Sequence, residues 1–175
     1  AACEKEQPAA VGGPFQLVDQ TGKPVDQRLL KGKWSAVFFG FTYCPDVCPT
    51  ELGTIAAALD AMGPAGEAVV PVLITVDPER DTPELLADYV GRFHPRMVGL
   101  TGTPEQVAAV ARLYRVYYAK ARRSEAPHYL VAPSGFTYLV GPDGRVRQLF
   151  RPGTAPEGLA ATVSAQLANR STSTN

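Results

Sequence analysis

The sequence predicts an α/β domain in which a central mixed sheet has helices on both faces. Two nearly continuous apolar runs, residues 34–41 and 68–76, are typical of strands that are covered on both sides. Segments with apolar residues at helical spacing follow both runs, and residues 136–150 have the pattern of a β-hairpin. Strands that alternate with helices and end in a hairpin favour a mixed sheet.

The composition is that of a single globular domain. The 175 residues include 17 Lys and Arg and 17 Asp and Glu, so the formal net charge is zero, and 45% of the residues are hydrophobic. This length is enough for one domain to bury its own core. No apolar run approaches the roughly 18 residues that a membrane-spanning helix needs. Zero net charge without a basic stripe argues against nucleic acid as a partner.

The two ends of the chain differ from the part between them. Residues 1–13 are small and polar with Pro and Gly, and residues 170–175 are also polar, so we expect a flexible leader, one domain over residues 14–169, and a flexible tail. The opening Ala1-Ala2-Cys3 resembles the end of a bacterial lipoprotein signal, in which the cysteine is lipidated after cleavage. Cys3 is therefore either a lipid tether outside the cytoplasm or an ordinary tail thiol.

The first half of the domain begins with a short N-terminal β-hairpin. Residues 15–18 and 24–25 are predicted to pair around a turn at Thr21-Gly22. Residues 34–41 are the first buried strand, and residues 50–62 are an Ala-rich helix that ends at Gly63-Pro64. Residues 68–76 are the second buried strand.

Two helices in the second half share one start signal. Thr82-Pro83 begins a helix to about His94, with Thr82 or Asp81 as its cap, and Thr103-Pro104 begins a helix to about Tyr118. The remaining predicted elements are a strand at 97–100, an irregular segment at 119–134, a hairpin at 136–150 and a helix at 155–169. This order of elements is that of a thioredoxin-like domain.

The most informative residues are two cysteines four positions apart. Cys44 and Cys48 stand between the first buried strand and the helix that follows it. Four residues are close to one helical turn, so both sulfurs can face the same side, with Cβ atoms about 5–6 Å apart. The helix N-terminus favours thiolate over thiol. The pair could therefore form a disulfide or hold a metal ion, and the plain alternative is two buried apolar cysteines.

The number of available ligands limits the metal. Structural zinc needs four Cys or His ligands, and this chain has two clustered cysteines and two histidines in all, so a closed zinc site is not expected. Two thiolates suit Cu(I), and a nearby imidazole would add capacity for Cu(II). Too few thiols are present for an iron–sulfur cluster.

Four segments, in order, resemble the Sco/SenC family: GPFQLVDQTGKPV (13–25), FGFTYCPDVCP (39–49), TVDPERDTP (75–83) and FTYLVGPDG (136–144). The resemblance covers about residues 13–165. It implies a thioredoxin-like fold, a tether at the outer, periplasmic face of the bacterial cytoplasmic membrane, and a role in maturing the dinuclear copper site of cytochrome c oxidase. Cys44 and Cys48 would then be the copper and redox pair. The implied partners are the copper-site subunit of the oxidase and another copper chaperone.

Members of this family act as copper chaperones, as thiol–disulfide reductases of the oxidase's copper-ligand cysteines, or as both. The family's third copper ligand is a histidine in a Tyr-Leu-Val-Asp-His-Ser type of segment. Here residues 129–134 are Tyr-Leu-Val-Ala-Pro-Ser, so Pro133 stands at the histidine position and Ala132 at the aspartate position. His128, in the same loop, is either a solvated side chain or a displaced copper ligand.

This difference favours Cu(I) over Cu(II) as the bound copper. Two thiolates can still bind Cu(I), whereas Cu(II) binding without an imidazole should weaken severely. Thiol–disulfide exchange needs no histidine, so the chain could still be a thiol–disulfide oxidoreductase. The alternatives are a non-enzymatic copper carrier or redox sensor and, lower in rank, a peroxiredoxin-like peroxidase. The peroxidatic motif has Thr or Ser and Pro where this chain has Pro45 and Phe41.

Two further polar features have structural interpretations. We expect residues 77–82 to cap the following helix and otherwise to form a solvated charged loop, with a docking surface near the cysteines as the alternative. We expect His94 to be a helix-end residue rather than a metal ligand. Three tyrosines at 114, 117 and 118 are expected to pack within the protein.

Overall fold

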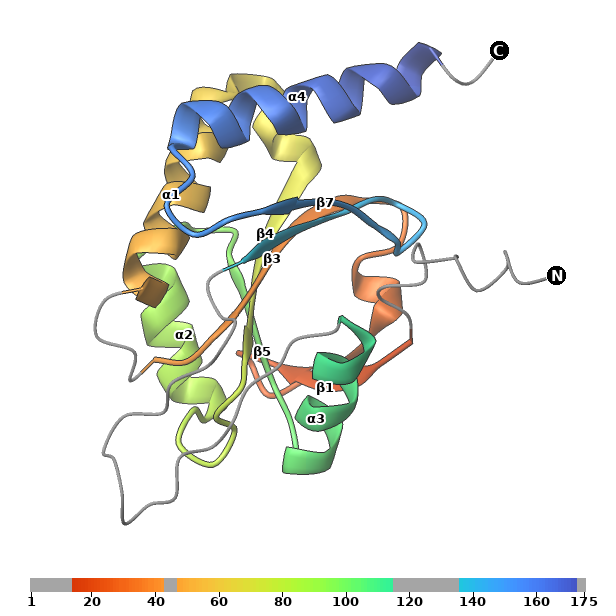
Figure 1. Cartoon of the computed structure of the whole chain (residues 1–175). Helices are drawn as coiled ribbons and strands as arrows, with labels where there is room; N and C mark the ends of the chain where they lie inside the picture. Colours follow the sequence, from red (N-terminus) through yellow and green to blue (C-terminus); the bar gives the residue numbers. More distant parts are fainter. Residues whose placement is uncertain (1–13, 43–46, 115–135, 173–175) are drawn as a thin grey trace, which may run out of the picture.

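A computed structural model describes residues 14–42, 47–114 and 136–172 of the chain (Figure 1). Within these ranges seven strands form one sheet in the order β2-β1-β5-β4-β3-β6-β7. The strands are β1 (Gln16–Asp19), β2 (Pro24–Asp26), β3 (Trp34–Gly40), β4 (Val69–Thr75), β5 (Val98–Thr101), β6 (Thr137–Val140) and β7 (Val146–Phe150). The three central strands β3, β4 and β5 are parallel, and the strands on either side are antiparallel to their neighbours. The predicted mixed sheet is confirmed.

Helices cover both faces of the sheet. The helices are α1 (Val47–Ala61), α2 (Pro83–Gly91), α3 (Pro104–Leu113) and α4 (Pro156–Thr172). Figure 1 shows α1, α2 and α4 on one side of the sheet, and α3 on the other side next to β1. Among the described residues, none of the helices is long and apolar enough to cross a membrane.

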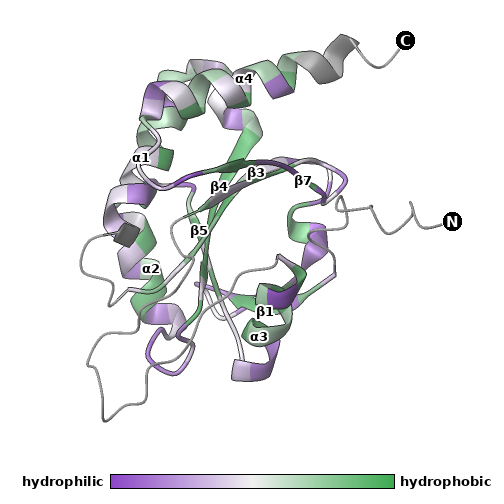
Figure 2. Cartoon of the chain, in the orientation of Figure 1, coloured by the Kyte–Doolittle hydropathy of each residue, from purple (hydrophilic) through white to green (hydrophobic). Residues whose placement is uncertain are grey.

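Alternate side chains of each central strand enter two separate hydrophobic clusters. Phe38 and Leu73 face α1, α2 and α4, whereas Phe39 and Ile74 face α3. All seven residues of β3 are buried, as a strand between two helical layers requires. Figure 2 shows mainly hydrophobic residues along β4 and mixed residues along the helices that cover it. The apolar runs in the sequence are therefore explained by burial on both faces.

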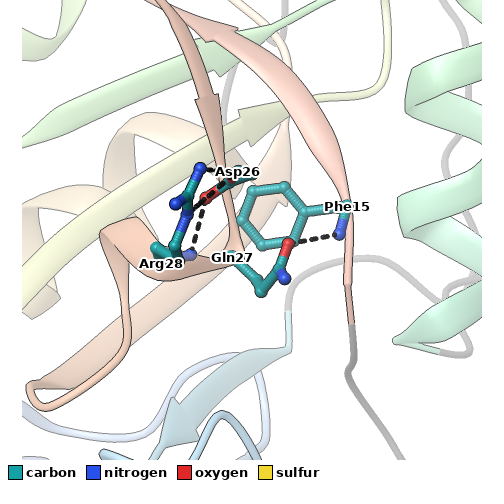
Figure 3. Close-up of polar contacts among 4 residues, drawn as sticks. All are labelled: Phe15, Asp26, Gln27 and Arg28. Carbon is teal, nitrogen blue, oxygen red and sulfur yellow. Dashed lines mark hydrogen bonds and ion pairs between the residues drawn. The ribbon is translucent and has the colours of Figure 1, made fainter.

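The N-terminal hairpin is confirmed. It has a glycine in its turn and polar contacts at its open end. Gly22 has a φ of 88° in the turn, a backbone conformation that favours glycine. After β2, the Phe15 N–H donates to Gln27 Oε1 at 3.3 Å, and Arg28 Nη2 lies 2.8 Å from Asp26 Oδ2 (Figure 3). The first contact joins the residue before β1 to the turn that follows β2, and the second lies within that turn.

Both predicted helix caps are present. Thr82 accepts a hydrogen bond from the Leu85 N–H, and Thr103 forms a reciprocal capping box with Gln106. The helix that Thr82 caps ends at Gly91 rather than near His94. His94 precedes Pro95, and helical backbone is disfavoured for a residue before proline, so the helix is not expected to continue through His94. Helix α3 is described as far as Leu113. Residues 115–118 of the predicted helix lie outside the described residues.

Two other helix boundaries differ from the prediction. Helix α1 begins at Val47, three residues before Thr50, and therefore includes Cys48 and Pro49. Proline is tolerated in the first turn of a helix, where its missing N–H would have no partner in the helix. Helix α4 continues to Thr172, beyond the predicted end at about residue 169.

Candidate thiol site at the start of helix α1

The structure places one of the two candidate cysteines in a regular element. Cys48 is the second residue of helix α1, and only its backbone is described. Cys44 lies in the segment 43–46, and His128, Ala132 and Pro133 lie in the segment 115–135, all outside the described residues. The geometry of the site is therefore that of the residues around the segment that joins β3 to α1.

This segment leaves the sheet at the carboxyl ends of the three parallel strands. Strand β3 ends at Gly40, next to Thr75 at the end of β4. The Val76 N–H donates to Gly40 O at 2.8 Å, which extends the pairing by one step. In α/β proteins, the carboxyl ends of parallel strands are where ligand-binding and catalytic residues gather.

A buried carboxylate holds the residue that precedes the cysteine segment. Asp81 Oδ2 accepts hydrogen bonds from the Thr42 N–H at 3.0 Å and from Thr75 Oγ1 at 2.7 Å. Asp81 Oδ1 accepts from Thr42 Oγ1 at 2.6 Å. The Asp81 side chain is fully buried, so these bonds are protected from water. The loop before α2 is thereby joined to the end of β3.

The prediction of a solvated charged loop at 77–82 is wrong for its two aspartates. Asp77 is 2% exposed and Asp81 is 0% exposed. Asp77 forms an ion pair with Arg80, and its N–H donates to Thr75 Oγ1 at 2.9 Å. Both carboxylates have partners, which offset the free-energy cost of their burial. The capping part of the prediction is correct, because Thr82 is the N-cap of α2.

A second buried carboxyl group holds the start of helix α1. Glu51, one turn after Cys48, is 5% exposed, and its Oε1 accepts from the Gly153 N–H at 2.8 Å. Burial raises the pKa of Glu51, and the bond from Gly153 lowers it to a smaller extent. Glu51 therefore connects the first turn of α1 with the loop between β7 and α4. The role of Glu51 was not predicted from the sequence. An acidic residue among the apolar positions of an Ala-rich helix is the pattern that could have indicated a buried carboxyl group.

An aromatic cluster lies beneath the sheet on the α3 side. The ring centroids of Phe39 and Tyr114 are 5.3 Å apart, and Tyr138 lies 5.7 Å from Phe39 and 5.6 Å from Tyr114. Burial, with a further contribution from Tyr138, raises the pKa of Tyr114 to about 12. The predicted packing role is confirmed for Tyr114, whereas Tyr117 and Tyr118 lie outside the described residues.

His94 lies at the other end of the sheet from the segment that joins β3 to α1. It precedes β5, at the end opposite to the carboxyl ends of β3 and β4. Its Nδ1 accepts from the Arg96 N–H at 3.1 Å, and its Nε2 lies 3.6 Å from Asp60 Oδ1. His94 lies three residues after the end of helix α2, and its N–H donates to Val90 O at 3.2 Å.

Within the described ranges, no three side chains of His, Cys, Asp or Glu lie close enough together to hold a metal ion. The carboxylates near the cysteine segment are engaged with hydrogen-bond donors instead.

Most of the chain is similar to known proteins. Residues 3–168 match the family model of SCO1/SenC. The mitochondrial SCO1 homolog 1 of Arabidopsis thaliana is 51% identical over 136 residues, which are 77% of this chain and 40% of that protein. SenC of Rhodobacter capsulatus is 42% identical over 166 residues, which are 93% of this chain and 75% of that protein. The chain spans about half the length of the mitochondrial relatives that it matches.

A solved structure extends the similarity to three dimensions. The crystal structure of Arabidopsis thaliana ScoI with copper bound superposes with a TM-score of 0.85 at 44% identity. The match covers 91% of this chain and 99% of that one. The thioredoxin-like fold is shared with it. By sequence and by structure, this chain belongs to the SCO1/SenC family.

Proposed function

We propose that this chain matures the copper site of cytochrome c oxidase through Cys44 and Cys48. The observation that carries the proposal is the position of the CxxxC segment. It joins β3 to α1 at the carboxyl ends of the parallel strands, in a chain that belongs to the SCO1/SenC family. The pair would either reduce a disulfide between the oxidase's copper-ligand cysteines or hand them Cu(I).

Copper as the cargo is supported by the family and by ligand chemistry. The related ScoI of Arabidopsis thaliana was solved with copper bound. In this chain, Cys44 and Cys48 would supply two thiolates, which are soft ligands and suit Cu(I). Pro133 cannot replace the imidazole of the family's third ligand, so Cu(II) should bind weakly unless His128 takes that place.

The thiol–disulfide reaction is the activity that the loss of the histidine leaves intact. One thiolate of the pair attacks a sulfur of the target disulfide, forms a mixed disulfide and releases one target thiolate. The second cysteine then attacks the sulfur of its own chain, closes the Cys44–Cys48 disulfide and releases the second target thiol. The target gains two electrons and two protons, and the protein loses them. We therefore rank reduction of the target above delivery of Cu(II).

The proposal includes a location and a chain organisation. We propose that the leader of residues 1–13 carries a lipid at Cys3 and joins it to the domain, which begins at residue 14 and ends with helix α4. The domain would then work at the periplasmic face of the cytoplasmic membrane, where the oxidase copper-site subunit and a second copper chaperone are its partners. Extraction of the full-length protein with membranes, and its release in a Cys3→Ser variant, would support this organisation.

The decisive experiment mixes the protein with an isolated oxidase copper-site domain. In one arm, the reduced protein meets the domain with its two ligand cysteines oxidised; in the other, the Cu(I)-loaded protein meets the reduced, copper-free domain. Mass spectrometry after alkylation counts thiols on both partners, and optical spectroscopy follows copper transfer. We expect both target cysteines to become thiols in the first arm with wild type, and no fully reduced target with Cys48→Ser, because a single cysteine cannot resolve the mixed disulfide. Neither thiol nor copper transfer in either arm would contradict the proposed function.

A further inference from the structure

We propose that Asp81 is a positioning residue for the cysteine pair, and that it acts through Thr42. The inference rests on the proposed function, because it concerns the same two thiols. Asp81 belongs to the loop between β4 and α2, whereas Thr42 lies two residues after the end of β3, and the two residues are 39 positions apart in sequence.

Three hydrogen bonds from two strand ends converge on the Asp81 carboxylate. Thr42 donates through both its N–H and its Oγ1, at 3.0 and 2.6 Å, and Thr75 donates through Oγ1 at 2.7 Å. The Asp81 N–H donates to Asp77 O at 2.9 Å, so the backbone of the acceptor is also fixed. Burial removes water as a competing partner, so the carboxyl group depends on these hydrogen bonds. A fully buried carboxylate with this set of bonds holds Thr42 firmly.

Thr42 controls one end of a very short connection. Consecutive Cα atoms are about 3.8 Å apart, so the Cα of Cys44 is at most about 7.6 Å from that of Thr42. The other end is the start of α1 at Val47, where Glu51 in the first turns of the helix is bound to Gly153. Residues 43–46 must therefore connect two anchored points. The placement of these ends restricts the conformations open to Cys44 relative to Cys48.

The consequence concerns the chemistry of the pair more than the stability of the fold. Disulfide closure and Cu(I) binding both need the two sulfurs side by side. A substitution that destabilises the oxidised and reduced forms equally leaves the reduction potential unchanged, because the potential reports only their difference. Releasing Thr42 should instead disfavour the states in which the sulfurs are paired. We therefore expect a substitution of Asp81 to shift the reduction potential of the cysteine pair, whereas a substitution of an ordinary core residue should not.

The test compares the redox equilibrium and Cu(I) affinity of four variants with wild type. Asp81→Ala removes all three acceptor interactions, and Thr42→Val removes only the hydroxyl bond. Asp81→Asn is the conservative rescue, because its carboxamide oxygen can accept from Thr75 and the Thr42 N–H while its NH₂ donates to the Thr42 hydroxyl oxygen. Met97→Ala is the matched control, because Met97 is a buried core residue before β5, at the opposite end of the sheet.

Equilibration with glutathione buffers measures the Cys44–Cys48 couple, and competition with a chromophoric chelator measures Cu(I) affinity. For Asp81→Ala we expect a roughly tenfold fall in the disulfide-forming equilibrium constant, which corresponds to a potential about 30 mV higher, and a similar loss of Cu(I) affinity. We expect a roughly threefold change for Thr42→Val, and values within about twofold of wild type for Asp81→Asn and Met97→Ala.

The outcomes separate this inference from the proposed function. If wild type forms the disulfide and binds Cu(I), but Thr42→Val and Asp81→Ala match Met97→Ala, positioning by Asp81 is contradicted and the proposed function stands. The same conclusion follows if Asp81→Asn shifts as far as Asp81→Ala, since charge rather than position would then act. If wild type neither forms the disulfide nor binds Cu(I), the proposed function fails, and the inference fails with it. Thr42→Val decides the question if Asp81→Ala does not fold.

Discussion

Asp81 and Glu51 are single acidic residues that hold the chain on either side of the segment that carries Cys44. Each is buried, and each accepts hydrogen bonds from a segment that is distant in sequence. Asp81 holds the residue before the cysteine segment, and Glu51 holds the helix that follows it. A buried carboxyl group without partners would be strongly destabilising, so these contacts determine where the two chain segments lie.

The raised pKa of Glu51 predicts a specific dependence of stability on pH. Because the folded pKa is above the ordinary value of 4.5, the folded state favours the protonated form. Glu51 thus contributes stability that is present below its ordinary pKa and is lost as the pH rises through its folded pKa. The glutamine of a Glu51→Gln variant cannot ionise, so its free energy of unfolding should rise relative to wild type between pH 4 and 7. Urea unfolding at both pH values measures this; parallel curves for the two proteins would contradict it.

The raised pKa of Tyr114 predicts a dependence of stability on pH in the alkaline range. Burial raises its pKa from 10.0 to about 12, so its contribution is fully present below pH 10 and is lost as the pH rises through 12. Two pKa units correspond to roughly 2–3 kcal/mol. Tyr114→Phe keeps the ring beside Phe39 and should retain more stability than wild type at pH 11. Thermal unfolding at pH 7 and 11 tests this, and an equal loss in both proteins would show that another group titrates.

At the scale of elements, local signals determine where helices begin more reliably than where they end. Threonine followed by proline correctly marks the starts of α2 and α3, because the N-cap hydroxyl and the fixed φ of proline act within one turn. The ends are marked less clearly, and both α2 and α4 end at residues other than the predicted ones. Helix α1 starts earlier than its Ala-rich pattern indicates, because Cys48 and Pro49 fit in its first turn.

The capping box of α3 gives a prediction for this scale. Thr103→Ala removes the hydroxyl acceptor of the Gln106 N–H and should lower the free energy of unfolding by about 1 kcal/mol. Thr103→Ser keeps the acceptor and is the matched control. Urea denaturation of both variants makes the comparison. Equal losses in the two variants would mean that the methyl group, rather than the capping hydroxyl, stabilises the helix.

At the scale of the whole molecule, the sequence predicts the sheet and its two helical layers well. Strands β3 and β4 are recognisable because burial on both faces requires unbroken apolar runs. The anchoring role of Asp81 was not predictable in the same way, because its donors lie on two other segments that only the sheet brings together. A charged residue in a loop sequence is usually solvated, and only tertiary contacts reveal the exception.

The departure from the family's histidine yields a prediction for the protein as a whole. Replacing Ala132 and Pro133 by Asp and His restores an imidazole at the family's ligand position, so Cu(II) affinity should rise by at least about tenfold. The matched control carries Asp and Asn at the same positions. Cu(II) competition titrations and the thiolate-to-copper absorption band measure the gain. Equal affinity in the two double variants would contradict the assignment of Pro133 to the histidine position.

The central claim is that Cys44 and Cys48 act together as one soft, two-thiolate site. An anaerobic titration of reduced protein with Cu(I), in competition with a chromophoric chelator, tests it most directly. We predict that wild type binds one Cu(I) per chain, and that Cys44→Ser and Cys48→Ser each lose at least about two orders of magnitude in affinity, since a single thiolate cannot replace the pair. Undiminished Cu(I) binding by the Cys44→Ser/Cys48→Ser protein would contradict the claim.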